Sequence, residues 1–159
     1  MQSTMNDDKE YLSQEKFDEL TKELEYLRSQ GRKKVLADLE YAKSLGDLSE
    51  NAEYHEARNK QGELEDRVAM LEVLLKSASI VSHKESDVVA MGSVVVMRKK
   101  GDDKDQTYEM VGTEEADMAK GKLSNKSPLG NALIGKKKGE TVSFKTPTGE
   151  MTYTIVEVK

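Results

Sequence analysis

The sequence predicts an α+β protein in which a long antiparallel helical hairpin occupies residues 1–80 and a small sheet domain occupies residues 81–159. Three observations predict this division. Residues 13–78 contain no proline and only three glycines, and good helix formers dominate them. Apolar residues recur there at every third or fourth position, which is typical of helices that pack against each other. After Val81 the apolar residues alternate instead, which is typical of strands.

The helical half contains two stripes of apolar residues that align as the facing arms of an antiparallel coiled coil. When positions are paired outward from a turn at Leu45–Ser49, Gly31 faces Leu64. A small residue thus lies opposite a large one. Beyond Gly31 the first stripe drifts to Val35 and Leu39, as a stutter in the repeat would. At about 1.5 Å per residue, arms of about 30 residues give a rod of about 45 Å. A rod of that length is too long for a core element of a small domain, so we expect it to reach out to another molecule.

The second half predicts a mostly antiparallel sheet packed on one short helix. Two pairs of alternating segments are typical of β-hairpins: residues 92–98 with 106–111, and 141–145 with 150–158. Between these hairpins, Ser127 and Pro128 suit the N-cap and the first position of a helix, and Gly135 ends it. Residues 79–90 are the expected link between the two halves.

Composition excludes several classes of protein. Of the 159 residues 35% are charged, with a net charge of −5, and residues 1–80 hold 12 basic and 18 acidic side chains. An acidic half disfavours sequence-independent duplex binding, which needs many Lys or Arg contacts to phosphate. The absence of cysteine excludes disulfides and fits a reducing cytoplasm. No signal peptide and no stretch of about 18 apolar residues is visible. We therefore expect a cytoplasmic protein without a membrane partner. Its polar first ten residues look like a short extension.

An acidic run, GDLSENAEY, separates the two helices at residues 46–54. Gly46 suits the end of the first helix. Asp47 and Glu50 have the spacing of a capping box, which would open the second helix. On spacing alone, this interpretation gives the two carboxylates a structural role and no function.

The wider segment GDLSENAEYHEAR, residues 46–58, closely resembles the hairpin tip of the bacterial GreA/GreB transcript cleavage factors. The resemblance continues through nearly the whole chain, including LEVLLKSASIV at 71–81 and SPLGNALIGKKKGE at 127–140. It leans toward the GreA type and implies an FKBP-like fold for the sheet domain. Two departures lie away from the tip: Lys16 stands where the family often has glycine, and Asn131 where it often has a basic residue.

This resemblance implies a transcription elongation factor whose hairpin enters the secondary channel of bacterial RNA polymerase. Asp47 and Glu50 would be the catalytic pair there, with Asp47 a ligand of a Mg²⁺ ion shared with the polymerase and Glu50 its partner or the group that orients water. The polymerase itself would then cut the 3′ end of backtracked nascent RNA, so the factor is neither an enzyme nor the holder of a cofactor of its own. Two metals stabilise the attacking and leaving oxygens of such a hydrolysis, and Mg²⁺ prefers carboxylate and water oxygens.

The resemblance also implies contacts outside the acidic pair. Contact with RNA or with the channel is expected from Lys43, Tyr54 and Arg58, and docking on the polymerase from Ser127, Pro128 and Leu129. The residues alone leave simpler roles open: a solvated face for the two cations, and core packing for Tyr54. His55 and His83 are too far apart in the sequence to suggest a metal site.

Three other functions stay open at this point. A non-cleaving regulator or inhibitor would occupy the same channel, but relatives of that type carry altered tip residues, and Asp47 and Glu50 are both present here. A prolyl isomerase needs an aromatic-lined pocket, for which the sheet domain offers only Tyr108, Phe144 and Tyr153. A structural coiled-coil adaptor would be a stable dimer, whereas we expect a monomer.

Overall fold

The computed structural model describes residues 9–82 and 84–159, which form two compact units. One unit is the hairpin, Phe17–Ser77, and the other combines residues 9–16 with Ala78–Lys159. Residues 1–8 of the expected extension and the histidine at position 83 lie outside the described residues. No helix of the described part is both long and apolar enough to cross a bilayer.

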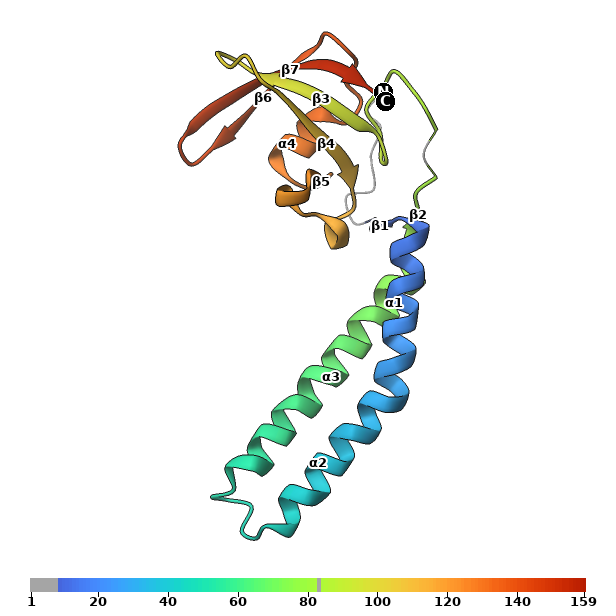
Figure 1. Ribbon diagram of the computed structural model, residues 1–159, viewed down its shortest axis with the longest axis vertical. Helices are drawn as coiled ribbons and strands as arrows, with labels where there is room; N and C mark the ends of the chain where they lie inside the picture. Colours follow the sequence, from blue (N-terminus) through green and yellow to red (C-terminus); the bar gives the residue numbers. More distant parts are fainter. Residues whose placement is uncertain (1–8, 83) are drawn as a thin grey trace. The chain divides into compact units, whose positions relative to one another are not determined.

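The structure of the hairpin unit confirms the prediction of two long antiparallel helical arms (Figure 1). The first arm consists of α1 (Gln14–Tyr26), a π-helical turn (Leu27–Gly31) and α2 (Arg32–Ser44). The second arm is the single helix α3 (Ala52–Ser77). The π turn lies where the first apolar stripe drifts. Since a π turn holds one residue more than an α turn, it absorbs the drift and returns the stripe to the face that meets α3.

The interior of the hairpin is narrow and apolar. An added Cβ on Gly31 would lie 3.1 Å from Leu64 Cδ1, which confirms the expected pairing of a small and a large residue. Pairs of opposite charge join the arms along the outside, including Arg32 with Glu65 at 2.9 Å. The buried side chains come from both arms: Leu20, Leu24, Leu39, Ala42, Ala57, Val68, Leu71 and Leu74.

The second unit is built on a five-stranded sheet with the order β5-β4-β3-β7-β6. Neighbouring strands are antiparallel except for β4 and β5, which are parallel. The mostly antiparallel sheet is thus confirmed. The strands are β3 (Val94–Lys99), β4 (Asp105–Val111), β5 (Lys122–Ser124), β6 (Thr141–Thr146) and β7 (Gly149–Val158).

The short helix α4 (Pro128–Leu133) packs against this sheet, as the sequence predicts. Ser127 Oγ accepts a hydrogen bond from the Gly130 N–H at 3.0 Å, which confirms the expected N-cap. Gly130 also permits a close approach, since an added Cβ would lie 1.9 Å from the Ser124 carbonyl oxygen. The core of this unit is formed by Val89, Val95, Met97, Met110, Leu123, Leu129, Leu133, Val142, Tyr153 and Ile155.

The expected link, residues 79–90, contains structured residues at both of its ends. At its start, β2 (Ser79–Ile80) pairs in parallel with β1 (Tyr11–Leu12). At its end, Val89 is 1% exposed and belongs to the core of the sheet unit. Both short strands hold only two residues, too few for an alternating pattern to show.

Candidate functional site

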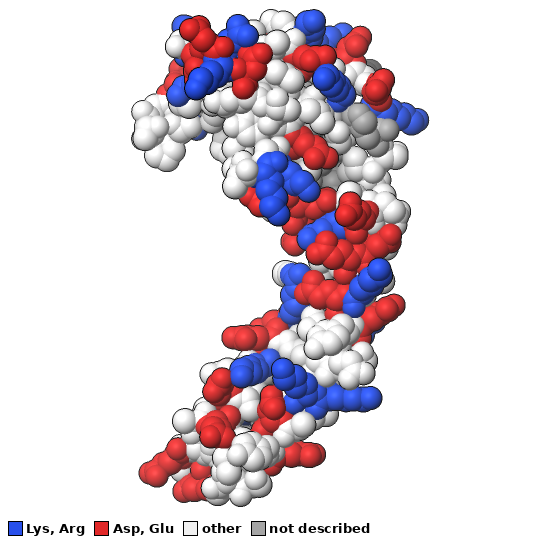
Figure 2. Space-filling view, in the orientation of Figure 1, with Lys and Arg blue, Asp and Glu red and all other residues white. Residues whose placement is uncertain are grey.

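The loop that joins α2 to α3 carries the acidic residues and is exposed to solvent. All residues from 43 to 50 are exposed. The Leu45 N–H bonds to the Ala42 carbonyl oxygen at 3.2 Å as α2 ends, and Gly46 follows with a φ of 124°. This positive φ is readily adopted only by glycine, which confirms Gly46 as the end of the first helix. Figure 2 shows acidic side chains at this end of the hairpin.

The prediction that Asp47 and Glu50 form a capping box at the start of the second helix was wrong. Helix α3 begins at Ala52, and its N-cap is Asn51, whose Oδ1 accepts a hydrogen bond from the Tyr54 N–H at 3.1 Å. The loop is longer than spacing alone suggested because Asp47 forms its own local turn. Capping therefore does not occupy either carboxylate.

Asp47 is held by the residue two places further on. Its Oδ1 accepts hydrogen bonds from the Ser49 backbone N–H at 3.0 Å and from the Ser49 hydroxyl at 2.9 Å. These bonds favour the charged form and lower the pKa of the Asp47 carboxyl below its ordinary value. Both end on Oδ1, which leaves Oδ2 available for a further ligand.

Asp47 and Glu50 line one shallow depression of about 330 Å³ at the tip, together with Leu45, Asn51, Ala52 and Glu53. Glu53 lies in the first turn of α3 and is a third carboxylate that sequence reasoning did not single out, although it belongs to the same acidic run. In the part of the chain that the structure describes, no three Asp, Glu or His side chains gather closely enough to hold a metal ion. The tip carboxylates are oxygen ligands of the kind that Mg²⁺ prefers.

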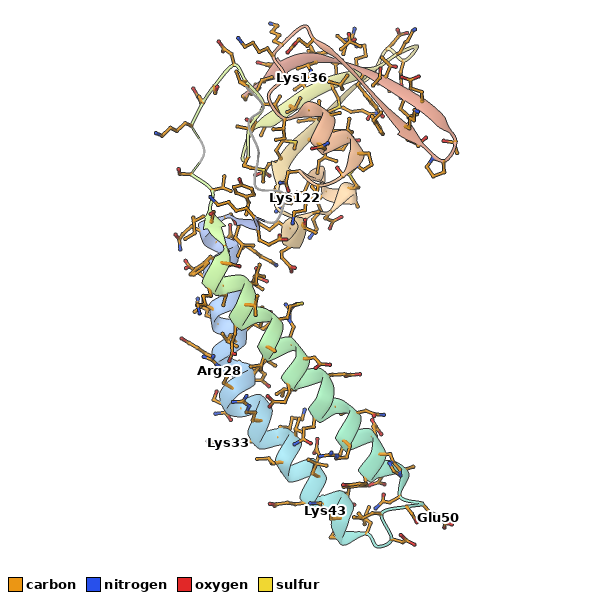
Figure 3. The ribbon with its side chains drawn as sticks, turned by 180° about the vertical axis from the view of Figure 1, so that it is seen from behind. Arg28, Lys33, Lys43, Glu50, Lys122 and Lys136 are labelled. Atoms are coloured by element: carbon orange, nitrogen blue, oxygen red, sulfur yellow. The ribbon has the colours of Figure 1, made fainter. Side chains whose placement is uncertain are left out.

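The three residues expected to contact RNA or the channel lie at increasing distances along the chain from this loop. Lys43 is exposed in the last turn of α2 and is seen with Glu50 at the same end of the hairpin (Figure 3). Tyr54 is half-buried, with its ring edge-on to His55 at 5.8 Å between centroids. Arg58, on the next turn of α3, is exposed and donates to Gln61 Oε1 at 2.8 Å.

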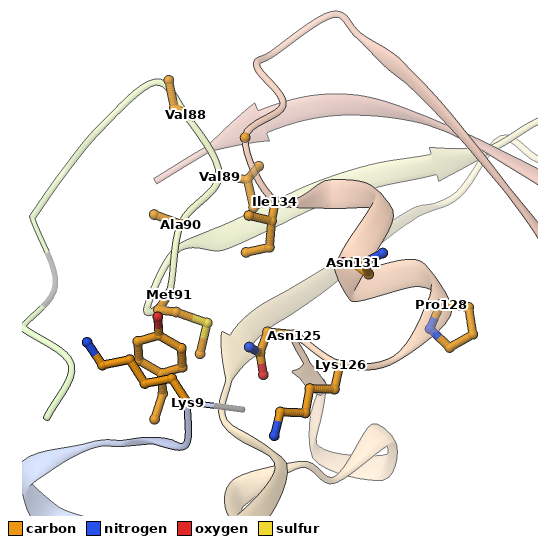
Figure 4. A pocket seen from close by; sticks show the side chains of 12 residues that line it. Lys9, Val88, Val89, Ala90, Met91, Asn125, Lys126, Pro128, Asn131 and Ile134 are labelled. Carbon is orange, nitrogen blue, oxygen red and sulfur yellow. The ribbon is translucent and has the colours of Figure 1, made fainter. Parts of the chain in front are cut away.

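The three expected docking residues do not share one surface. Leu129 is 7% exposed and belongs to the core of the sheet unit, and Ser127 caps α4. Pro128 is exposed and, with Asn131 and Ile134, lines a cavity of about 860 Å³ in this unit (Figure 4). Of the three expected docking residues, Pro128 is thus the exposed one, and the exposed Asn131 belongs to the wider segment 127–134 that the resemblance also marks for docking.

Comparison with known families assigns both halves of the chain. The family models described as "Transcription elongation factor, N-terminal" and "Transcription elongation factor, GreA/GreB, C-term" match residues 10–80 and 83–159. The chain belongs to the GreA/GreB family of transcription elongation factors.

Curated relatives agree with this assignment. The chain is 40% identical over 158 residues to transcription elongation factor GreA of Clostridioides difficile. The aligned residues cover 98% of this chain and 99% of the relative. It is 42% identical over 149 residues to GreA of Lactococcus lactis, covering 92% and 96%. A GreA of Clostridium botulinum is 47% identical over 116 residues, 72% of each chain.

Solved structures give a weaker likeness. The Gfh1 protein of Thermus thermophilus matches with a TM-score of 0.43 and 24% identity, over 95% of this chain and 99% of that one. A GreA/GreB factor from Nitrosomonas europaea matches with a TM-score of 0.42 and 28% identity, over 58% and 78%. These scores are too low to support any conclusion about this chain.

Proposed function

We propose that this elongation factor binds bacterial RNA polymerase and stimulates the polymerase's own cleavage of backtracked RNA. The hairpin enters the secondary channel and brings Asp47 and Glu50 to the polymerase active site. The observation that supports this most is the placement of the pair: two exposed carboxylates at the end of a helical hairpin, neither of them used to cap a helix. The family membership and the GreA relatives support the same function.

The chemistry is a hydrolysis in which the factor supplies ligands and orientation. The residues at the tip fit a Mg²⁺ ion, since Mg²⁺ takes one or two carboxylates and keeps several waters. Asp47 would hold it through Oδ2, and Glu50 would accept a hydrogen bond from the attacking water. Bound Mg²⁺ supplies charge stabilisation for the phosphate in the transition state. Water adds to phosphorus and gives up a proton, and the bond to the 3′ oxygen of the preceding nucleotide breaks. That oxygen takes up a proton and leaves as a new 3′ hydroxyl, and the released fragment keeps the phosphate.

The cations near the tip act on the RNA. Lys43 and Arg58 are exposed on α2 and α3, close in sequence to the two ends of the loop. Contacts between such side chains and phosphates weaken as salt rises. Tyr54, which is half-buried, offers the remaining surface of its ring to the extruded 3′ end.

The sheet unit, which we expect to have an FKBP-like fold, docks at the mouth of the channel. Pro128 and Asn131 provide the exposed contacts beside the cavity that they line. One monomer serves one polymerase, because one hairpin fills the channel.

RNA cleavage in an arrested bacterial elongation complex tests this function. The wild-type chain should accelerate release of 3′ fragments, and Asp47→Asn combined with Glu50→Gln should abolish the acceleration. Glu53→Gln is the matched control, since it removes one carboxylate from the same depression and should leave most of the activity. Equal stimulation by the double variant and the wild type would refute metal delivery by this pair.

A further inference from the structure

One side chain connects the two helices on either side of the acidic loop. Asn51 Oδ1 accepts from the Tyr54 N–H of α3 at 3.1 Å, and Asn51 Nδ2 donates to the Ala42 carbonyl oxygen of α2 at 2.6 Å. We call this pair of bonds the Asn51 bridge. The two partners also fix which way the amide points, since only one orientation places a donor on the carbonyl and an acceptor on the N–H.

The Asn51 bridge gives a partner to the Tyr54 N–H, which lies in the first turn of α3 where helix N–H groups lack one. It also adds a side-chain donor to the Ala42 carbonyl in the last turn of α2, which accepts from the Leu45 N–H as well. Asn51 is half-buried, whereas residues 43–50 are all exposed. The side chain is therefore a partly desolvated cross-link at the point where the loop begins and ends.

The acidic residues themselves have only local support. The hydrogen bonds of Asp47 go to Ser49, within the same loop. His55 Nε2 approaches the Ser49 carbonyl oxygen at 3.4 Å, a longer contact. The two arms pack against each other through buried residues that include Ala42 and Ala57, and the Asn51 bridge adds a direct hydrogen-bonded connection between α2 and the start of α3 beside the acidic pair.

We propose that Asn51 is a positioning residue for the acidic pair, acting through the simultaneous donor and acceptor of its amide. This inference rests on the proposed function for its effect on cleavage. It explains why an amide stands at a position where Asp or Ser would cap the helix equally well. A carboxylate or a hydroxyl keeps the acceptor for Tyr54, but neither donates to Ala42 in the same geometry.

Two substitutions separate positioning from capping. Asn51→Asp and Asn51→Ser both retain the N-cap acceptor, and both lose the donor that reaches α2. Asp adds a negative charge and Ser does not, so an effect common to both variants comes from the lost bond. Asn59→Ser is the matched control, because Asn59 is exposed on the same helix.

Cleavage in an arrested elongation complex gives the first readout. Both Asn51 variants should show a maximal rate lower by roughly ten- to hundred-fold, the usual effect of misplacing a reacting group by about 1 Å. The concentration of factor at half-maximal rate should stay at the wild-type value, and so should the Asn59→Ser rate. A wild-type rate for Asn51→Ser would overturn the proposal.

Backbone ¹⁵N relaxation of the free protein gives the second readout and does not depend on the proposed function. Order parameters of residues 46–49 should fall in both Asn51 variants, while those of α3 stay at wild-type values. Unchanged loop order in both variants would overturn the proposal. If the wild type itself fails to stimulate cleavage, the proposed function fails, and the loop order alone decides whether Asn51 positions the loop.

Discussion

At position 47 the pKa of the carboxyl group is set by hydrogen bonds from the serine two residues away. The hydrogen bonds from the Ser49 N–H and hydroxyl stabilise the ionised form, so the pKa of Asp47 lies below its ordinary value. The carboxylate stays charged as pH falls until the solution reaches this lowered pKa. A metal ligand benefits, since it must be deprotonated to bind.

Ser49→Ala should raise the pKa of Asp47 part of the way toward its ordinary value. The hydroxyl bond is lost, but the backbone N–H bond remains, so the shift should be incomplete. A ¹³C titration of the Asp47 carboxyl between about pH 2 and pH 6 measures it. Ser44→Ala, which removes a hydroxyl bonded to Tyr41 instead, is the control. An Asp47 titration unchanged by Ser49→Ala would show that the hydroxyl bond does not form in solution.

The sequence places the acidic pair in an exposed loop between the helices, which the structure confirms, but it does not show the pair's hydrogen bonds. The run GDLSENAEY carries the resemblance to the family, from which the role of Asp47 and Glu50 is predicted. Asx turns and N-caps use the same residue types. Asp47 and Asn51 are both suitable caps, and spacing alone selected the wrong one. What decides is that Asn51 can also reach the Ala42 carbonyl across the loop, a contact between segments that the sequence does not show.

Among the helical elements, the π turn at Leu27–Gly31 has the least expected form, and it marks a surplus residue. In a continuous α-helix each extra residue rotates the rest of the helix by about 100°. The wider turn cancels that rotation, which is why Leu39 and Ala42 are buried although the repeat slips before them. The sequence revealed the slip as a stutter. It did not reveal whether the helix would bend, unwind or widen, because that depends on packing against α3.

Deleting Gln30, which is exposed, should convert the π turn into ordinary α-helix and leave the packing of both arms intact. The melting temperature should stay within about 4 °C of wild type, equivalent to about 1 kcal/mol for a chain of this size. Deleting the exposed Lys22 in α1 is the control, since it turns Leu24 away from the interior and should lower the melting temperature by at least about 10 °C. Equal losses from both deletions would contradict this account of the turn.

The interior of the hairpin is thin, so each buried leucine should matter to its stability. Leu71 is 0% exposed, and Leu71→Ala should reduce the free energy of unfolding by about 2–5 kcal/mol. Val73→Ala, two residues away at a side chain that is 69% exposed, should change it by less than about 0.5 kcal/mol. Urea unfolding followed by circular dichroism measures both. Similar losses for the two variants would mean that another surface covers Val73 in solution.

On the scale of the whole molecule, the two apolar stripes pack against each other within one chain. The facing residues of the two arms contact each other, as the buried Gly31 and the half-buried Leu64 do. Light scattering after size-exclusion chromatography should therefore give a mass near 17.8 kDa. A stable dimer would instead favour the structural adaptor that the stripes alone left open.

If the tip carboxylates help hold a Mg²⁺ ion in the polymerase active site, as we propose, the Mg²⁺ dependence of cleavage should change when they are replaced. RNA cleavage in arrested complexes is measured over a series of Mg²⁺ concentrations at saturating factor. Relative to wild type, Asp47→Asn should raise the concentration at half-maximal rate by at least about ten-fold, a typical cost of disturbing a metal site. Glu53→Gln should leave this concentration unchanged. A lower rate for Asp47→Asn with the wild-type Mg²⁺ dependence would contradict the account.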